Sequence, residues 1–312
     1  MLSVDIIDKI KIKLKLNSLS VNLSRDIACL VHPISFPEGY SEADLLNYLR
    51  GFYLQGSSTS ELRNYLDQDF KRFVYTLNLL PAQQGNLFEI GGNPYFTSLL
   101  IKKFTNYNMY LSNYFGPSFD REATQIMVND QTKEDIQFDF INHNIEEEDI
   151  PFEQKFDVVL FCEVIEHLTV DPLAALLRIK RSLKDQGHLI LTTPNVNRLA
   201  NVAKMIKGMN IYDPYSGYGP YGRHNREYNK HELALLLEHL GFEIEVMFSS
   251  DVHFNEAASI MDYKELLPLV EHRKFDLGQY IFIRAKNVKE AKECKPNWLY
   301  RSYPEGDICV DC

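Results

Sequence analysis

The chain has 312 residues, of which 45% are hydrophobic and 24% charged, a composition that supports a globular protein with a sizeable core. Its formal net charge of -10 repels polyanions, so nucleic acid is not an expected partner. The sequence has no run of about 18 apolar residues and no secretion signal, which predicts a cytoplasmic protein without a transmembrane segment.

The first feature in chain order is an alternation of lysine and apolar residues over residues 9–16. It predicts a solvent-exposed strand and leaves a membrane-surface segment as the alternative. From Ser41 the apolar residues recur at helical spacing as far as Leu80, and Pro81 ends the pattern. We therefore expect residues 1–83 to form a mostly helical N-terminal extension or cap.

Beyond this extension, short apolar runs alternate with helical patterns, which is typical of βαβ units around a parallel sheet. The predicted fold is a Rossmann-like, doubly wound α/β domain over residues 84–290, followed by a C-terminal tail of residues 291–312. The seven predicted strands cover residues 86–90, 109–114, 136–140, 156–161, 188–193, 242–248 and 280–284.

A long insertion, residues 196–228, separates the fifth and sixth predicted strands, and loops of this length in compact domains are usually functional. Its tyrosines suit stacking on a sugar face or an aromatic ring. An exposed surface that binds no ligand is the alternative, and both interpretations remain open. The tyrosines are Tyr212, Tyr215, Tyr218 and Tyr221.

The five cysteines, at positions 29, 162, 294, 309 and 312, are odd in number and irregularly spaced, which predicts reduced thiols. Cys309 and Cys312 form a C-x-x-C pair at the C-terminus. A zinc site needs four ligands, so Cys294 and a histidine would have to come from elsewhere. We therefore predict a frayed tail here.

The first predicted strand runs into Glu89-Ile90-Gly91-Gly92-Asn93, an acid and two glycines followed by a helical pattern. Glycines at such a turn let the backbone approach a ligand at the carboxyl edge of the sheet, where open α/β folds bind their ligands. The G-x-G-x-x-G fingerprint of dinucleotide-binding folds is absent, so a plain strand-to-helix turn remains the alternative.

The sequence resembles class I S-adenosylmethionine-dependent methyltransferases over residues 84–285. The resemblance is most specific in F-D-V-V-L-F-C-E-V-I-E-H-L at 156–168 and G-H-L-I-L-T-T-P-N at 187–195. It implies a seven-stranded sheet whose last strand is antiparallel, and S-adenosyl-L-methionine as cofactor. The implied cofactor-binding residues stand at the ends of the first four strands and are Glu89, Gly91, Gly92, Asn93, Asn113, Asn144, Ile145, Cys162 and Glu163.

Three positions depart from the family pattern: Asn93 and Tyr95 replace glycines of the cofactor loop, and Asn113 replaces the acid that binds the ribose. An asparagine offers a diol a donor and an acceptor without the strength of a charge-assisted hydrogen bond. On this basis Asn113→Asp is expected to tighten cofactor binding. The departures also favour a rival hypothesis, a scaffold or sensor that binds the cofactor without turnover.

Glu163, Glu166 and His167 stand at i, i+3 and i+4, which predicts that one helix turn presents all three beside the cofactor. With His224 they resemble the metal site of small-RNA 2′-O-methyltransferases and the Glu-x-x-Glu-His motif of ubiquinone-pathway O-methyltransferases. The resemblance implies a divalent metal on these four residues, and mixed nitrogen and oxygen ligands favour Mn, Fe, Co or Zn over Mg. Without a metal, His167 is the predicted general base and His224 the second candidate.

Such a base or metal favours oxygen as the methyl acceptor, and nothing here resembles the Asn/Asp-Pro-Pro-Tyr/Phe loop used for nitrogen. The segments N-P-Y-F at 93–96 and W-L-Y-R-S-Y at 298–303 resemble bacterial methyltransferases of polysaccharide and glycolipid assembly. We therefore predict methyl transfer to a hydroxyl of a sugar or glycan precursor, with a small molecule or glycan as partner. A phenolic or lipid-like hydroxyl and an RNA 2′-hydroxyl are alternatives, the latter opposed by the net charge of -10.

Overall fold

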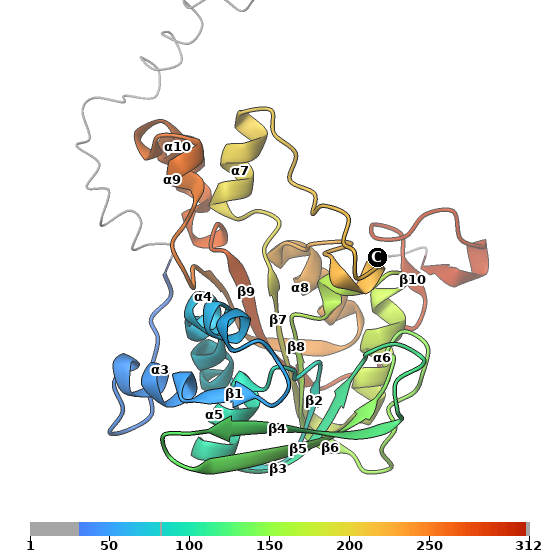
Figure 1. The fold of residues 1–312 in the computed structure, drawn as a ribbon. Helices are drawn as coiled ribbons and strands as arrows, with labels where there is room; N and C mark the ends of the chain where they lie inside the picture. The colour runs from blue at the N-terminus through green and yellow to red at the C-terminus, as the bar shows by residue number, and fades with distance from the viewer. Residues whose placement is uncertain (1–30, 82, 310–312) are drawn as a thin grey trace, which may run out of the picture.

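The computed structural model describes residues 31–81 and 83–309, which form a nine-stranded sheet with helices on both faces and a small two-stranded sheet near the C-terminus (Figure 1). The strands of the large sheet are β1 (Phe52–Leu54), β2 (Gln84–Ile90), β3 (Asn106–Asn113), β4 (Glu122–Asn129), β5 (Glu134–Asn142), β6 (Phe156–Cys162), β7 (Leu183–Pro194), β8 (Phe242–Ser250) and β9 (Tyr280–Asn287). In space they follow the order β1-β4-β5-β3-β2-β6-β7-β9-β8. Residues 9–16, Cys29 and Cys312 lie outside the described residues.

The predicted α/β fold with a mostly parallel sheet is confirmed. Neighbouring strands β5, β3, β2, β6 and β7 run parallel to one another. The last strand of the sheet, β9, lies antiparallel between β7 and β8, as the family resemblance implies. The carboxyl ends of β2, β3, β5, β6 and β7 therefore meet at one edge, where this class of fold binds ligands.

The sheet has nine strands in the described part of the chain, so the predicted number of seven is wrong. β4 pairs antiparallel with β5, and the turn between them is closed by the side chain of Asn129, which accepts hydrogen bonds from the backbone N–H groups of Gln131 (3.0 Å) and Thr132 (3.1 Å). β1 adds three residues to the outer edge of β4. Neither strand is evident in the sequence, because the turn lacks an Asn-Gly type signal and three residues show no periodicity.

Alternate side chains of the central strands face apolar cores on opposite faces of the sheet. On one face, Val159 and Phe161 pack in a cluster with helices α6 (Pro172–Ser182) and α8 (Lys230–His239). On the other, Val158 and Leu160 pack with α4 (Thr59–Asn78), which also contacts α5 (Phe96–Phe104). Burial on both faces explains why these strands are continuous apolar runs. None of the helices in the described ranges has both the length and the apolar composition needed to cross a membrane.

The segment from Ser41 to Leu80 contains two helices, α3 (Glu42–Arg50) and α4, with β1 between them. Ser41 begins α3 with a capping box: its hydroxyl accepts from the Asp44 backbone N–H, and the Asp44 carboxylate accepts from the Ser41 backbone N–H. α4 is 20 residues long, and side chains from its central part line a cavity at the carboxyl end of the sheet. The N-terminal segment is thus part of the site as well as of the fold.

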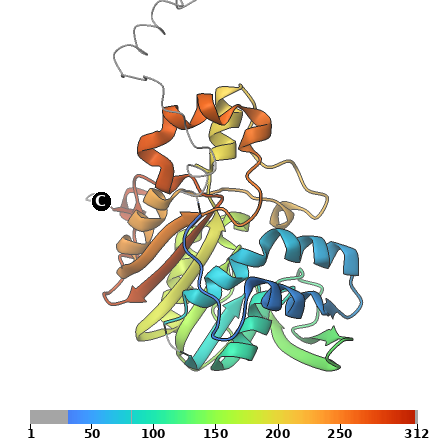
Figure 2. The ribbon, with the colours of Figure 1, turned by 90° about the vertical axis from the view of Figure 1, so that its left-hand side faces the viewer.

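The insertion of residues 196–228 contains a helix, α7 (Leu199–Ile206), and a 3-10 helix, η2 (Pro220–Gly222), where the sequence predicts a loop. α7 packs with α9 (Ala257–Ile260) and α10 (Tyr263–Val270) around an apolar cluster of its own. Both views show these three helices grouped beyond the end of the sheet (Figures 1 and 2). The 3-10 helix η3 (Glu271–Asp276) leads from this group back to β9.

The C-terminal tail packs against the domain, so the prediction of a frayed end is wrong as far as residue 309. Its strands β10 (Lys295–Pro296) and β11 (Ile308–Cys309) pair in parallel, with the 3-10 helix η4 (Glu305–Asp307) before β11. The Tyr300 hydroxyl donates to Asp171 Oδ1 at 2.5 Å, and the Lys295 ammonium lies 2.9 Å from Asp171 Oδ2. The tail brings Cys294 and Cys309 to a Cα separation of 5.4 Å and joins them in a disulfide, which contradicts the predicted reduced thiols for this pair.

Candidate active site

A cavity of about 260 Å³ lies at the carboxyl ends of β2 and β6, bordered by α4 and by the end of the insertion. Most of the predicted site residues line it, namely Glu89, Gly91, Gly92, Asn93, Cys162, Glu163, Glu166, His167 and His224. The described lining does not include Asn113, Asn144 or Ile145. The structure therefore brings the predicted cofactor loop and the predicted glutamate-histidine cluster into one cavity.

The turn after β2 contains a buried carboxyl group and two glycines that let a ligand approach the backbone closely. Glu89 is 4% exposed and accepts a 2.5 Å hydrogen bond from Ser98 Oγ on α5. Burial raises the pKa of Glu89 to about 7, against the lowering effect of the Ser98 hydroxyl. Gly91 has a φ of 75°, and a β-carbon on Gly92 would stand 3.0 Å from the carboxyl carbon of Glu89. The backbone of the turn thus favours glycine at Gly91, and a side chain at Gly92 would press on the Glu89 carboxyl group.

Asn113, at the end of β3, holds this turn in place. Its Oδ1 accepts a hydrogen bond from the Asn93 backbone N–H (3.1 Å), and its Nδ2 donates to the Tyr95 hydroxyl (2.9 Å). The Asn93 side chain and the Tyr95 hydroxyl both donate to Gln125 Oε1 on β4, at 2.9 and 2.6 Å. The three departures from the family pattern therefore belong to one hydrogen-bond network, which stabilises the turn that glycines form elsewhere.

This network reverses the effect that the sequence predicts for Asn113→Asp. A carboxylate cannot donate to the Tyr95 hydroxyl, and it can accept from that hydroxyl only if the hydroxyl stops donating to Gln125, so the network loses one hydrogen bond in either arrangement. The substitution also buries a negative charge, because this position is 4% exposed. We expect denaturation to show a loss of about 1–3 kcal/mol in the free energy of unfolding, and calorimetry to show weaker binding of S-adenosylhomocysteine. The exposed Asn108→Asp on the same strand is the control. If Asn113→Asp bound S-adenosylhomocysteine more tightly, with an unchanged free energy of unfolding, Asn113 would be assigned to binding of the ribose.

Asn144 and Ile145, which follow β5, lie beside the insertion and the core. The Asn144 side chain is 3.3 Å from the Tyr221 hydroxyl, and its Oδ1 accepts from the Glu146 backbone N–H at 3.1 Å. Ile145 is 5% exposed and packs in the same cluster as α6. In this structure Asn144 thus connects β5 to the insertion and Ile145 packs in the core, and neither lines the cavity.

Glu163 follows β6 in a left-handed conformation, with a φ of 55°. Its Oε1 accepts a 2.7 Å hydrogen bond from Thr192 Oγ1 and lies 3.9 Å from the Arg72 guanidinium. The predicted helix turn is replaced by a 3-10 helix, η1 (Ile165–His167), that begins two residues later. The expectation that one helix face presents all three residues is therefore wrong, because the backbone reverses at Glu163 and turns its carboxylate toward α4. A left-handed non-glycine residue is also a typical mark of a functional site.

Glu166 is fully buried and keeps one carboxylate oxygen without a hydrogen bond. Thr193 Oγ1 donates to its Oε2 at 2.9 Å, while Oε1 has no hydrogen-bond partner among the described residues and lies 3.8 Å from His167 Nε2. Burial, and then the charge of Glu163, raise the pKa of Glu166 well above its usual value. A cation next to Oε1 would favour the charged carboxylate.

The two histidines of the cavity are held in the same way, each with its Nδ1 next to a hydrogen-bond acceptor. His167 Nδ1 lies 3.0 Å from the Arg223 carbonyl, and His224 Nδ1 lies 2.9 Å from Glu227 Oε1. Both partners are acceptors, so Nδ1 donates in each ring and Nε2 carries a lone pair. The rings meet edge to face with centroids 5.0 Å apart, and one ligand atom from each of Glu166, His167 and His224 lies within 4.8 Å of the others. Such carboxylate or carbonyl partners on the far nitrogen are typical of metal-ligating histidines.

The opposite wall of the cavity comes from α4 and β9, which the sequence analysis does not assign to the site. Arg72 is 5% exposed, pairs with Asp69 at 3.1 Å and donates to the Tyr65 hydroxyl at 2.5 Å. Its guanidinium also lies over the ring of Tyr280, 5.5 Å from the centroid. One feature of the sequence indicates this wall: Asp69 and Arg72 stand at i and i+3 on the apolar face of a long predicted helix.

The chain belongs to the Methyltransferase domain family, whose model matches residues 61–246, more than half of the chain. No curated protein matches the sequence.

Solved methyltransferase structures are also similar in fold. A chain of the complex between the Haloferax volcanii Trm112 methyltransferase activator and a methyltransferase is 13% identical with a TM-score of 0.46, covering 73% of this chain and 91% of that one. An S-adenosylmethionine dependent methyltransferase from Mesorhizobium loti is 13% identical with a TM-score of 0.41, covering 68% and 95%. The N-methyltransferase NodS from Bradyrhizobium japonicum, in complex with S-adenosyl-l-homocysteine, is 13% identical with a TM-score of 0.42, covering 72% and 91%.

Proposed function

We propose that this protein transfers the methyl group of S-adenosyl-L-methionine to a hydroxyl of a sugar or glycan precursor. Membership of the methyltransferase family supports the transfer. The observation that carries the choice of oxygen is the cluster of Glu166, His167 and His224 in the same cavity as the turn after β2. A hydroxyl must lose its proton when it is methylated, and this cluster can accept or displace that proton.

The turn after β2 is the proposed binding site for the methionyl end of the cofactor. When bound, S-adenosyl-L-methionine supplies an electrophilic methyl group on a positively charged sulfur. The ionised form of Glu89 would balance the positive charge of the methionyl end, while Gly91 and Gly92 allow close approach of the backbone. The chain contributes mainly orientation, since displacement at a methyl group depends on alignment.

Glu166, His167 and His224 fit a divalent cation. The fit rests on the unpartnered Glu166 Oε1 and on the two rings whose Nδ1 atoms are held by acceptors. Nitrogen and oxygen ligands favour Mn, Fe, Co or Zn over Mg, and such a cation lowers the pKa of a hydroxyl that it binds. Glu163, the fourth predicted ligand, hydrogen-bonds to Thr192 and approaches Arg72 in this structure, so we propose it as a positioning residue for that wall.

His167 is the proposed proton acceptor if the cavity works without a cation. Burial, and then the neighbouring His224, lower its pKa, so the ring is neutral at physiological pH. Its Nδ1 is engaged by the Arg223 carbonyl, which leaves Nε2 as the basic nitrogen toward the cavity. His224 is held by Glu227 in the same way and is the second candidate.

The insertion is the proposed contact surface for the acceptor. Tyr212, Tyr215 and Tyr218 are 83, 92 and 94% exposed, so their rings are free to stack on a flat sugar or aromatic face. Arg223, next to the catalytic His224, lies over the Tyr215 ring at 4.6 Å. Through Arg223, the exposed tyrosines are connected to the edge of the cavity at His224.

A labelled-methyl transfer screen against glycans, phenols, lipid-like alcohols and RNA tests the proposal. We expect label on a sugar hydroxyl, with less on the other acceptors. Label on a phenol or an RNA 2′-hydroxyl would replace the acceptor while keeping oxygen chemistry. Tight S-adenosylhomocysteine binding without transfer to any acceptor, and without slow cofactor hydrolysis, would indicate a binding scaffold instead.

The pH dependence of cofactor binding follows from Glu89. Because burial raises its pKa to about 7, the group is protonated in the free protein below that pH and must ionise to balance the cationic cofactor. We expect calorimetry to show affinity for S-adenosyl-L-methionine that is flat above pH 7 and falls about tenfold per pH unit below it.

Two variants check that the pH effect belongs to this carboxyl group. Glu89→Gln should bind weakly with a flat pH profile. Ser98→Ala removes the hydrogen bond that lowers the pKa of Glu89, so the break in the profile should move to higher pH. A pH profile unchanged in Glu89→Gln would exclude the assigned role.

A further inference from the structure

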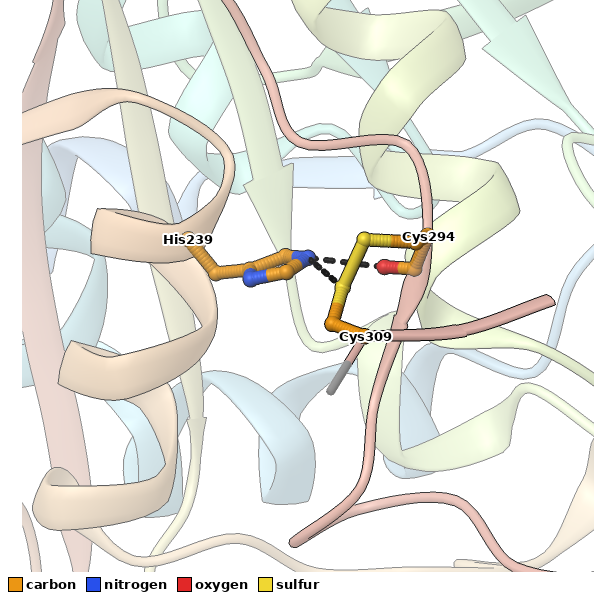
Figure 3. Close-up of side chains that lie close together, drawn as sticks. All are labelled: His239, Cys294 and Cys309. Carbon is orange, nitrogen blue, oxygen red and sulfur yellow. Dashed lines mark hydrogen bonds between the residues drawn. A yellow bond between two sulfur atoms is a disulfide. The ribbon is translucent and has the colours of Figure 1, made fainter. Parts of the chain in front are cut away.

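A second cluster of metal-binding side chains lies where the C-terminal tail meets α8 (Figure 3). His239, the last residue of α8, points at the disulfide between Cys294 and Cys309. Its Nε2 lies 2.8 Å from the Cys294 carbonyl and 3.9 Å from Cys309 Sγ. One ligand atom from each of the three residues lies within 4.8 Å of the others, and none of the three lines the catalytic cavity.

We propose that the reduced form of Cys294 and Cys309 binds a zinc ion together with His239, and that the ion fastens the tail to α8. The chain supplies these three ligands, and a solvent molecule would complete the four-coordinate shell.

The distances suit a tetrahedral zinc site. With Zn–N and Zn–S bonds of about 2.0 and 2.3 Å, a nitrogen and a sulfur ligand stand about 3.5 Å apart, and two sulfurs about 3.8 Å apart. The distance from His239 Nε2 to Cys309 Sγ is 3.9 Å, so the two atoms need only a small movement to reach the first value. The Cα atoms of the two cysteines are 5.4 Å apart. Rotation of the cysteine side chains after reduction is therefore enough to separate the sulfurs.

Burial and ligand type favour zinc over harder ions. His239 and Cys309 are 8 and 7% exposed, so both sit in the interior between the tail and α8. Thiolate and imidazole are soft ligands that select zinc over magnesium or calcium. The catalytic cluster has one carboxylate and two imidazoles, so the two clusters differ in the number of thiolates they offer.

The chemistry of the change balances with an ordinary cellular reductant. Two molecules of a low-molecular-weight thiol reduce the disulfide to two cysteine thiols and leave as their own disulfide. Zinc then replaces the two thiol protons. The hydrogen bond that His239 Nε2 makes with the Cys294 carbonyl is replaced by the metal bond, and the imidazole proton moves to Nδ1.

The proposed site would hold the tail where it contacts the start of α6. The two cysteines enclose β10, β11 and Tyr300, whose hydroxyl binds Asp171 Oδ1, and Asp171 caps α6. Asp171 follows the catalytic His167 by four residues. Loss of the zinc would therefore loosen a segment that braces the helix after the catalytic turn.

The full chain, kept reduced by a phosphine to avoid competing thiols, is titrated with Co²⁺ and Zn²⁺. We expect one of the cobalt ions that bind to give a near-ultraviolet thiolate charge-transfer band, which zinc removes when it displaces that ion. His239→Gln and Cys309→Ser should lose the band. Cys162→Ser is the matched cysteine control and Glu166→Ala the control for the catalytic cluster, and both should keep the band.

His239→Gln keeps both cysteines, so its result does not depend on an unfolded tail. Loss of the band in this variant, with wild-type near-ultraviolet circular dichroism, supports the site. No band in the reduced wild-type chain, or the same band in His239→Gln, would overturn it and leave a structural disulfide.

Discussion

Gly91→Val is expected to reduce the affinity for S-adenosylhomocysteine by more than about 100-fold, equivalent to about 2.7 kcal/mol. Gly91 has a φ of 75°, a conformation that a β-branched residue rarely adopts. A β-carbon there would also stand 2.8 Å from Val164 Cγ2, next to Glu163. The substitution therefore displaces both the turn after β2 and the residues after β6, which form two sides of the cavity.

A matched control separates local shape from general destabilisation. Gly116 also has a positive φ, 96°, but no described atom lies within 4 Å of the place its β-carbon would take. Gly116→Val should lose a similar amount of stability to backbone strain and keep cofactor affinity. Calorimetry with both variants, at a temperature where each is folded by circular dichroism, makes the comparison. Wild-type affinity in Gly91→Val would show that the cofactor binds elsewhere.

Glu166→Ala and His224→Ala are each expected to lower turnover by about 100-fold or more and to remove bound metal. Both residues contribute to one ligand cluster, and removal of either leaves two ligands. Chelation should abolish activity, and add-back of Mn²⁺ or Co²⁺ should restore it. Metal content is measured in a His239→Gln background, so that the proposed zinc site in the tail does not contribute.

The exposed His231→Ala, on α8, is the control and should have wild-type activity and metal content. Glu227→Gln, which weakens the acceptor on His224 Nδ1, should reduce metal affinity about 10- to 100-fold without removing a ligand. If metal-stripped enzyme keeps full activity, and only His167→Ala is severely impaired, the cation is excluded and His167 is the base.

Periodicity in the sequence predicted the parts of the fold where burial is uniform. The apolar runs of β6 and of the second half of β7 are buried on both faces. β6 lies where the sequence predicts it, and β7 contains the predicted residues 188–193 but begins earlier, at Leu183. β4 escaped prediction because its burial is uneven, from the exposed Glu122 and Thr124 to the buried Met127, and its turn depends on the Asn129 side chain. The spacing of apolar residues indicates helices and strands one at a time, and it does not predict a turn that depends on hydrogen bonds from one side chain.

For the site, the sequence predicted which residue types gather at the sheet edge, but not their orientations. The left-handed backbone at Glu163 is set by its surroundings, and it turns the carboxylate from His167 toward Arg72. Arg72 itself lies outside the motifs that carry the resemblance, and it reaches the cavity through the packing of α4 against α5. The pairing of His239 with the tail depends on the same kind of contact between distant segments.

The insertion is tied together at its base: Asn195 bridges to Tyr228, and the Glu166 carbonyl accepts from the backbone N–H groups of Asn225 (2.7 Å) and Arg226 (3.2 Å). A loop whose ends are already joined changes length at small cost, about 0.6 kcal/mol for each doubling. The segment that carries the exposed tyrosines can therefore be exchanged, provided that Asp213 is kept, because it accepts a hydrogen bond from the His224 backbone N–H (3.1 Å). If the tyrosines bind the acceptor as proposed, chimeras that replace only residues 214–219 should alter acceptor choice and leave cofactor binding intact.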